Sequence, residues 1–472
     1  MSQDVSRVDA AARSRVSEAL PLWRSRDPDA PIAWRAGQPV SARQFLADVQ
    51  RLAMRLPAEA RVVNLCTDRY RFSVVLVAAW ARGEVCLLPP NAMPDTLARL
   101  VQPDRALVLL SDDPGFETGL APVMHVDAPW PASADAPGTP FAVEPDAEVV
   151  CLMTSGSTGD PQPHAKRWRP LLLNIAAEAE RLAESLGRRD LSGLTIVASV
   201  PPQHSYGLES SVLLALLGGA AFDSGRPFYP ADIAASLAAV PRPRALVTTP
   251  FHLKTLLLSG VQLPPVDLVL SATAPLSPQL AAQAEAAFGG VLIEIYGCTE
   301  AGQVASRRTT EGQGWTTLGH LRLRSEAGAE GGVFVVEGGH VVEPTVLADV
   351  LELDDARHFR LLGRSNDLIH VAGKRSSLAY LNFQLNRVEG VQDGCFWMPD
   401  DVVDGVVRPV AFVVAPGLSP AEVVARLRPL LEPAFVPRKV VPVPALPRND
   451  TGKLTAQALR EFALAQLSGG PR

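Results

Sequence analysis

The feature that most constrains the fold is a repeated alternation of short apolar runs with longer amphipathic ones. Apolar runs of four to six residues fit buried strands, and the stretches between them carry helical spacing. Such a repeat predicts an α/β fold with a largely parallel sheet, in which ligands bind at the carboxyl ends of strands. The strand candidates are Val62–Leu65, Val85–Leu88, Ala106–Leu110, Thr195–Val200, Ala245–Thr248, Leu268–Ser271 and Leu292–Ile295, and the helix candidates are Phe72–Arg82, Asp95–Val101, Trp168–Leu186 and Leu208–Leu217.

The pattern changes in the last third of the chain. Residues 331–354 alternate like antiparallel strands around Gly338-Gly339, which predicts a hairpin. From about Ser365 a separate small α+β unit is expected. Its strand candidates are Cys395–Met398 and Arg408–Val414, and its helix candidates are Pro420–Leu431 and Thr455–Leu467.

Composition describes an ordinary globular protein of 472 residues with 47% hydrophobic and 20% charged residues. The net charge of −6 and the scattered basic residues argue against nucleic-acid binding. The five cysteines form no CxxC pair, so no metal cluster is expected, and Cys66, Cys86 and Cys151 fit small buried residues. No apolar signal core precedes residue 18, and the longest apolar stretch, Ser73–Ala81, is too short for a bilayer. These observations favour a cytoplasmic protein without a membrane partner.

A hydroxyl- and glycine-rich hexapeptide, Thr154–Gly159, directly follows the apolar run Val149–Met153. Its sequence, Thr-Ser-Gly-Ser-Thr-Gly, can turn backbone N–H groups and hydroxyls toward phosphate oxygens. No Lys follows Gly159, so this is not the P-loop of nucleotide-binding proteins, and a flexible surface loop is the alternative. The loops Gln203–Gly207 and Tyr296–Glu300 also follow strand candidates, so all three are expected to meet in one cleft.

Five segments together resemble the adenylate-forming superfamily, which includes acyl- and aryl-CoA synthetases, nonribosomal adenylation domains and firefly luciferase. The segments occur in the family's order and the resemblance covers roughly residues 20–465: Thr154–Gly159, Tyr296–Glu300, Asp349, Gly363–Asp367 and Leu446–Lys453. The resemblance implies a large N-terminal domain (residues 1–364) with mainly parallel sheets and a small β-barrel-like part. It also implies a small mobile α+β C-terminal lid domain (residues 365–472).

The resemblance implies a site for ATP and Mg²⁺ in the N-terminal domain. The β- and γ-phosphates would lie on Thr154, Ser155, Gly156, Ser157, Thr158 and Gly159, the adenine against Tyr296, the α-phosphate on Thr299, Mg²⁺ on Glu300, and the ribose hydroxyls on Asp349. Arg364 would contact the ribose or a phosphate, and Gly297 also belongs to the cofactor-binding set. Hard cations bind oxygen ligands, and a carboxylate suits two ribose hydroxyls. A core position for the Tyr296 ring is the alternative.

Three further residues take roles from the resemblance. Lys453 would bridge the substrate carboxylate and the α-phosphate, His204 would gate the passage between the acyl and thiol pockets, and Lys374, with Arg375, would meet the phosphates of CoA or of a phosphopantetheine arm. The chain departs from the family at Gln162, where Lys is usual and Lys166 could supply the charge, at Leu347-Ala348 before Asp349, and at the hinge position Asn366.

The expected activity has two steps. A carboxylic acid and ATP give acyl-AMP and pyrophosphate, and a thiol of CoA or of an acyl carrier protein then displaces AMP. The chain is most similar to compact bacterial acyl and aryl ligases of pigment-type pathways, which points to an aromatic acid such as hydroxybenzoate. Of three alternatives, two stay open: a stand-alone amino-acid adenylation enzyme, with Glu209 as an imperfect partner for the amino group, and a non-catalytic AMP- or acyl-AMP-binding protein. The third, a monooxygenase of the luciferase kind, would need oxygen chemistry to which nothing in the sequence points.

Overall fold

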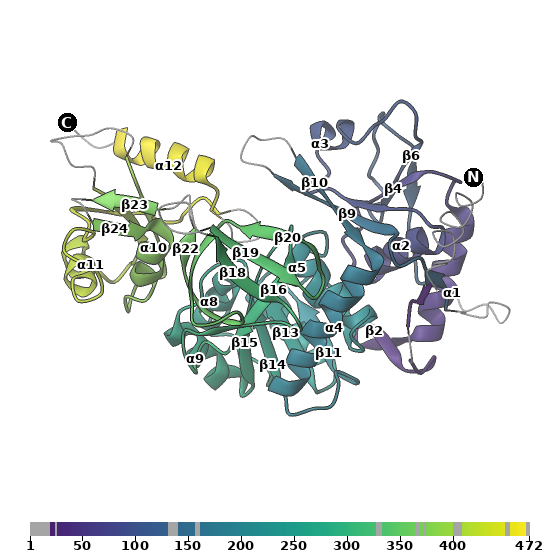
Figure 1. Ribbon diagram of the computed structural model, residues 1–472, viewed down its shortest axis with the longest axis horizontal. Coiled ribbons are helices and arrows are strands. Elements are labelled where there is room, and N and C mark those ends of the chain that lie inside the picture. Colours follow the sequence, from purple (N-terminus) through teal and green to yellow (C-terminus); the bar gives the residue numbers. More distant parts are fainter. Residues whose placement is uncertain are drawn as a thin grey trace, which may run out of the picture.

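The computed structural model describes most of the chain. The described residues are 19–23, 26–130, 140–155, 161–326, 333–364, 368–371, 374–399, 408–448 and 454–468. Figure 1 shows the N-terminal elements α1 and α2 at one end of the molecule, the large central sheet in the middle, and α10 to α12 at the other end.

The first sheet has the strand order β10-β9-β5-β4-β6-β7. All neighbouring pairs are parallel except the β9–β10 pair, which is antiparallel. Its strands are β4 (Arg61–Asn64), β5 (Cys86–Leu88), β6 (Leu107–Ser111), β7 (Val123–His125), β9 (Glu148–Ser155) and β10 (Pro161–Arg167), with α3 (Pro94–Ala98) between β5 and β6 and the small pair β1 (Leu20–Pro21) and β8 (Ala142–Val143) beside it.

The second sheet has the order β21-β22-β17-β16-β15-β14-β13-β11-β12-β2-β3. Its middle, from β15 to β2, is parallel, and antiparallel strands extend it on both sides. The strands are β2 (Pro31–Arg35), β3 (Gln38–Ser41), β11 (Thr195–Ala198), β12 (Ala221–Asp223), β13 (Arg244–Thr248), β14 (Leu268–Ser271), β15 (Val291–Cys298), β16 (Gly302–Arg307), β17 (Trp315–Thr317), β21 (Asp349–Leu353) and β22 (His358–Arg364).

Helices cover both sheets. They are α1 (Ala42–Arg55), α2 (Arg69–Ala81), α4 (Trp168–Ser185), α5 (Ser205–Gly207), the π-helix η1 (Leu208–Leu213), α6 (Leu214–Leu216), α7 (Pro230–Ala239), α8 (Pro250–Leu258) and α9 (Pro278–Phe288). Helix α2 is buried along most of its length in the largest core cluster, and Asp68 caps it by accepting from the Arg71 N–H.

A three-stranded antiparallel sheet completes the N-terminal part. It consists of β18 (Arg322–Glu326), β19 (Val333–Gly338) and β20 (Val341–Leu347), and it shares a core with β15 to β17 and β22 through Trp315, Phe334 and Phe359. The predicted hairpin around Gly338-Gly339 is confirmed, since both glycines adopt positive φ between β19 and β20.

The C-terminal part is a smaller α+β unit with two cores of its own. Its elements are β23 (Leu368–Val371), β24 (Lys374–Ser377), α10 (Leu378–Asn386), β25 (Asp393–Trp397), β26 (Val410–Val414), α11 (Pro420–Leu427), β27 (Lys439–Pro442) and α12 (Ala456–Ser468). The α/β class with a large N-terminal and a small C-terminal domain is therefore confirmed.

Three local expectations need correction. The helix predicted over 208–217 begins as a π-helix, where the Ser211 hydroxyl donates back to the Gly207 carbonyl. The helix predicted to reach Leu431 ends at Leu427. Cys151 is half-buried, whereas Cys66 and Cys86 are buried as expected.

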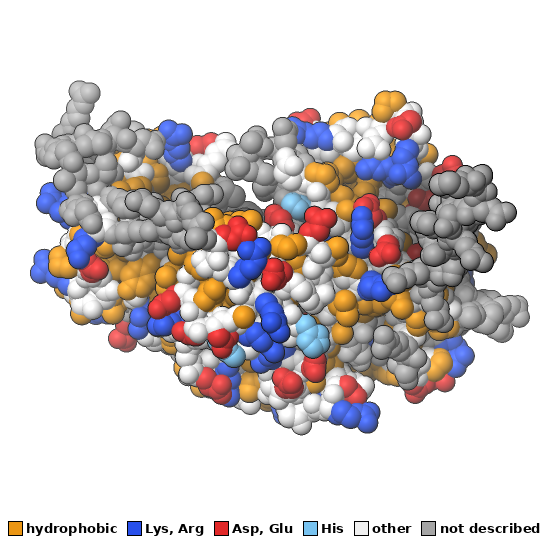
Figure 2. Space-filling model, in the orientation of Figure 1, with side chains coloured by type: hydrophobic (Ala, Val, Ile, Leu, Met, Phe, Trp, Pro, Cys, Tyr) orange, Lys and Arg blue, Asp and Glu red, His pale blue; other side chains and the backbone are white. Residues whose placement is uncertain are grey.

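No helix in the described part of the chain is long and apolar enough to cross a bilayer. Acidic and basic side chains are interspersed on the face shown in Figure 2, as the nearly balanced composition suggests.

Candidate active site

The predicted phosphate loop lies between two paired strands. Ser155 at the end of β9 pairs with Pro161 at the start of β10, and Thr154 pairs with Gln162, so the two ends of the loop are held together. Residues 156–160, which include Gly156, Ser157, Thr158 and Gly159, lie outside the described residues, as do the side chains of Thr154 and Ser155.

The second predicted segment forms the turn between β15 and β16. Gly297 has no room for a side chain, because a Cβ there would lie 2.3 Å from the Gly302 carbonyl oxygen. The Lys166 ammonium donates a hydrogen bond to the Thr299 carbonyl. Lys166, rather than Gln162, thus brings a positive charge from β10 to this turn. Burial raises the pKa of Cys298 to about 12, so its thiol stays protonated.

Glu300 is half exposed at the tip of the turn, with 54% of its side chain accessible. Its Oε1 lies 3.9 Å from His164 Nε2. Mg²⁺ at nucleotide sites is bound by one or two carboxylates, phosphate oxygens and water, and a single accessible carboxylate fits that coordination. The described residues contain no cluster of three His, Cys, Asp or Glu that could hold a metal alone. His164 had no signal in the sequence beyond its place on β10.

Tyr296 and Asp349 meet across 53 residues of sequence. The Tyr296 hydroxyl donates to Asp349 Oδ2 at 2.7 Å. The Tyr296 ring is 9% exposed and its centroid lies 5.7 Å from those of Trp315 and Phe359, so most of the ring belongs to the core. Stacking of adenine on this ring stays a prediction.

Asp349 and Arg364 are cross-strand partners in the β21–β22 ladder. The sequence could connect these two residues only through family spacing, and the structure places them opposite each other on adjacent strands. The Arg364 side chain lies outside the described atoms.

His204 precedes α5 and its carbonyl accepts from the Leu208 N–H at 2.7 Å. The chain turns tightly here, because a Cβ on Gly207 would meet the Pro201 carbonyl oxygen at 1.9 Å. The π-helix η1 begins at Leu208, directly after the short helix α5. Such π-turns occur often at functional sites.

Of the C-terminal candidates, the structure describes the side chain of Lys374 only. Lys374 lies on β24 with its Nζ 3.5 Å from Glu432 Oε2, and its side chain is largely exposed. Lys453 lies outside the described residues, as does Asn366, and the side chain of Arg375 is likewise not described.

A contact between the two parts of the chain was not predicted. Lys254 on α8 donates to the Val391 carbonyl at 2.7 Å, and burial lowers its pKa to about 8. Arg448 binds Asp393 with two hydrogen bonds of 2.7 Å and lies over the ring of Phe251, 5.7 Å from the centroid. A Lys in an amphipathic helix is usually solvated, so the sequence held no sign of this contact.

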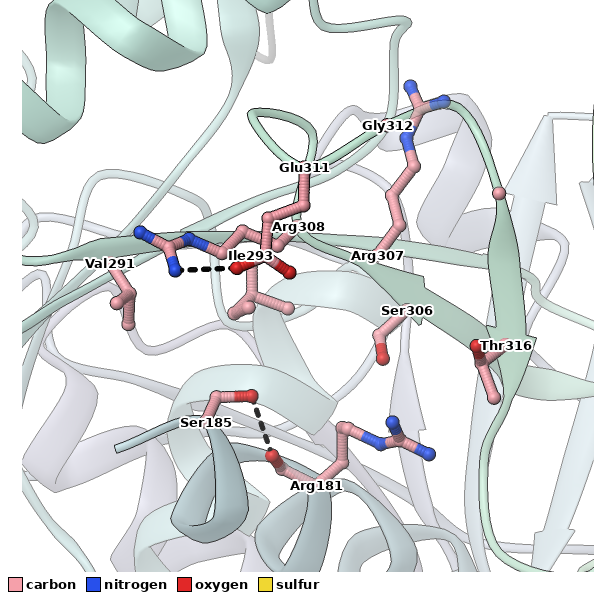
Figure 3. A pocket seen from close by; sticks show the side chains of 11 residues that line it. Arg181, Ser185, Val291, Ile293, Ser306, Arg307, Arg308, Glu311, Gly312 and Thr316 are labelled. Atoms are coloured by element: carbon pink, nitrogen blue, oxygen red, sulfur yellow. Dashed lines mark hydrogen bonds and ion pairs between the residues drawn. The ribbon is translucent and has the colours of Figure 1, made fainter. Parts of the chain in front are cut away.

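An open cavity of about 410 Å³ lies near the amino-terminal end of β15 (Figure 3). Its cations are already paired: Arg308 Nη1 lies 2.8 Å from Glu311 and Arg307 Nη2 lies 2.6 Å from Glu294. The predicted site is at the other end of β15, where parallel strands present ligands.

Comparison with known proteins identifies the chain's class. The sequence pattern of the family described as "AMP-binding enzyme" matches residues 22–323, and that of "AMP-binding enzyme C-terminal domain" matches residues 384–453. The chain therefore belongs to the AMP-binding enzyme family, which is the resemblance that its motifs indicated.

Two relatives and one solved structure are similar to this chain. A 4-coumarate–CoA ligase of Rhodobacter capsulatus is 29% identical over 288 residues, 61% of this chain and 69% of the relative. An anthranilate–CoA ligase of Pseudomonas aeruginosa is 26% identical over 503 residues, covering 93% of this chain and 94% of the relative. O-succinylbenzoate coenzyme A synthetase from Bacillus subtilis, solved with ATP and a magnesium ion, superposes with a TM-score of 0.74 at 20% identity, covering 92% and 97% of the two chains. That likeness shows the fold. The chain is an AMP-forming acid–thiol ligase.

Proposed function

We propose that this enzyme activates an aromatic carboxylic acid, of which hydroxybenzoate is an example, as its acyl-AMP and transfers the acyl group to a thiol. The observation that carries the proposal is the β15–β16 turn. It combines the Thr299–Glu300 pair, the Lys166 ammonium bound to the Thr299 carbonyl, and the Tyr296 hydroxyl bound to Asp349. The similarity to 4-coumarate and anthranilate ligases supports an aromatic substrate.

In the first step, a substrate carboxylate oxygen attacks the α-phosphorus of ATP and the bond to pyrophosphate breaks. Both reactants are anionic, so the site has to offset their repulsion with positive charge and oriented donors. We assign Glu300 to the magnesium ion, Thr299 to the α-phosphate, Asp349 to the ribose, Arg364 to the ribose or a phosphate, and Tyr296 to the adenine, with Gly297 beside it in the nucleotide site. When bound, Mg²⁺ neutralises charge on the phosphate oxygens.

The loop Thr154–Gly159 is assigned to the β- and γ-phosphates, and the paired ends of β9 and β10 support that role by fixing where the loop begins and ends. Lys453 is assigned to the reacting oxygens between the carboxylate and the α-phosphate. It belongs to a C-terminal domain that we place at residues 365–472 and that would turn between the two steps.

In the second step, a thiolate sulfur attacks the acyl carbon, the thioester bond forms and AMP leaves with the electrons of the broken C–O bond. His204 is assigned to the gate between the acyl and thiol pockets, and Lys374 to the phosphates of CoA or of a carrier-bound phosphopantetheine. The acceptor is either free CoA or an acyl carrier protein in the cytoplasm.

Acid-dependent exchange of pyrophosphate into ATP tests the first step. Exchange with benzoic or cinnamic acids, but not with fatty acids or amino acids, is the expected result. Glu300→Ala and Lys453→Ala should each lower the exchange by about 100-fold or more. The absence of exchange with every acid would support the non-catalytic alternative, and exchange with amino acids alone would support the adenylation enzyme.

Thioester formation with free CoA, compared with a phosphopantetheinylated carrier protein, identifies the acceptor. If the family pattern holds, Lys453→Ala retains thioester formation from supplied acyl-AMP while adenylation is lost. Equal loss of both steps would refute the specific role of Lys453.

A further inference from the structure

Beside the β15–β16 turn lies a buried polar cluster with unfilled hydrogen-bonding capacity. It consists of Asn174 and Glu178 on α4, Tyr206 on α5, Glu209 and Ser210 on η1, and Gln303 on β16. Glu178 and Ser210 are completely buried, and Asn174, Glu209 and Gln303 are at most 3% exposed.

Part of this cluster is internally satisfied. Glu209 accepts from Asn174 Nδ2 at 3.1 Å and from the Ser205 hydroxyl at 2.9 Å. The Gln303 amide donates to the Ser210 hydroxyl at 2.7 Å. Glu209 is thereby committed to two donors of the protein, which explains why it is a poor partner for a substrate amino group.

Five buried atoms of the cluster make no hydrogen bond of good geometry, although Ser210 and Gln303 approach Glu178 and the Thr248 backbone approaches Tyr206: Asn174 Oδ1, Glu178 Oε1 and Oε2, the Tyr206 hydroxyl and Gln303 Oε1. Buried polar atoms without partners are rare in folded proteins because each is destabilising. Four of the five atoms are carbonyl or carboxyl oxygens. A bound group that donates hydrogen bonds would satisfy these oxygens.

The cluster is contiguous with the proposed reaction site. Gln303 pairs with Gly297 across the β15–β16 ladder, and a Cβ on Gly302 would lie 3.0 Å from Asn174 Nδ2. Tyr206 follows the proposed gate His204 by two residues. An acid whose carboxylate lies at the turn would extend its other end toward these elements.

We propose that this cluster recognises a hydrogen-bond donor on the substrate, an amino or hydroxyl group on the ring of the acid. Glu178 is the main acceptor of the hydrogen bond from that group. The inference rests on the proposed function and narrows its substrate class. A ring without a donor would leave the acceptors of Glu178, Asn174 and Gln303 unfilled, and sites built to hydrogen-bond a substrate discriminate strongly against analogues that lack the group.

Burial supports this assignment. It raises the pKa of Glu178 to about 8, outweighing the smaller lowering effect of the nearby Ser210 and Gln303 side chains. Burial and, to a smaller extent, the charge of Glu178 hold the pKa of Tyr206 well above its usual value, so its hydroxyl remains a donor. A neutral carboxyl beside a phenol can both accept from a substrate amine or hydroxyl and donate to it.

The test compares matched acids in pyrophosphate exchange. Each of the 2-, 3- and 4-amino- and hydroxybenzoates is compared with the methylbenzoate of the same substitution, which has a similar shape and no donor. The wild-type ratio of kcat/KM for the preferred donor acid over its methyl counterpart should be at least about tenfold. Whether the amino or the hydroxyl series is preferred identifies the donor, and either result supports the proposal.

In Glu178→Leu the ratio should fall to within about threefold of unity, and Glu178→Gln, which keeps one acceptor, should be intermediate. The control is Glu180→Gln, an exposed position on the same helix, which should keep the wild-type ratio. A merely structural role for Glu178 would lower the rates for both acids together and leave their ratio unchanged. If Glu178→Leu fails to fold, Gln303→Leu provides the same comparison.

A wild-type ratio near one, or a ratio that Glu178→Leu does not change, overturns the inference and means that water fills the cluster, while the adenylation function stands. Absence of exchange with every acid instead overturns the proposed function itself. The two failures are therefore distinguishable.

Discussion

Glu178 should make the folding stability depend on pH, and the isosteric substitution Glu178→Gln should remove this dependence. Its pKa is raised from 4.5 to about 8 by burial, so the folded chain keeps a proton that the unfolded chain releases. Between these two values the unfolded state binds fewer protons, so the stability contribution is complete below pH 4.5 and is lost as the pH rises through 8.

The magnitude follows from the two pKa values. Raising the pH from 5 to 8 should destabilise the wild type by about 3 to 4 kcal/mol relative to Glu178→Gln, which carries no titrating proton. Near pH 5 the two proteins should be within about 1 kcal/mol of each other, because Gln has the shape and neutrality of the protonated acid.

Urea unfolding of both proteins at pH 5, 6, 7 and 8 measures this difference, and the effects of all other titrating groups cancel between them. Glu180→Gln serves as the control and should track the wild type at every pH. A constant difference between wild type and Glu178→Gln across this range would show that Glu178 is ionised in the folded protein, and the reasoning from burial would be wrong.

Three further changes have defined expectations. Gly297→Ala places a methyl group against the Gly302 carbonyl. The substitution should lower the free energy of unfolding by about 2 kcal/mol or more and should also lower ATP-dependent activity. An unchanged melting temperature would contradict the crowding at this position. Asp349→Asn keeps the side-chain shape but removes the charge, and should raise the KM for ATP about 10- to 100-fold, whereas an unchanged KM would remove Asp349 from the nucleotide site. Lys254→Ala removes the 2.7 Å hydrogen bond to the Val391 carbonyl and should weaken docking of the C-terminal part by about 1–2 kcal/mol. Weaker docking should appear as faster limited proteolysis. The control is Lys439→Ala at an exposed position, and equal proteolysis of the two variants would speak against the contact.

Periodicity alone predicted the parallel middle of the large sheet, because β13 and β14 are short, fully buried and flanked by amphipathic helices. It did not predict how antiparallel strands extend that sheet. Strands such as β17 are only three residues long, and their pairing is set by long-range contacts like those of Trp315 with Phe359.

The site shows the same division. Tyr296 and Asp349 were identified by motif and spacing, and the structure brings their side chains together. Glu178 was not identified, because an acidic residue within a helix normally faces solvent and only the packing of α4 against η1 and β16 reveals its burial. The partner of Lys254 likewise follows from how the two parts of the chain dock.

The pairing of Asp349 with Arg364 has a mechanical consequence. Strand β22 ends at Arg364 and continues, after three residues, into the first strand of the C-terminal unit, while its ladder partner carries the carboxylate that contacts Tyr296. If Asp349 binds the ribose as we propose, the nucleotide contacts the strand that is paired with the segment leading into the smaller unit. We therefore expect nucleotide binding to influence the orientation of the smaller unit through β21 and β22.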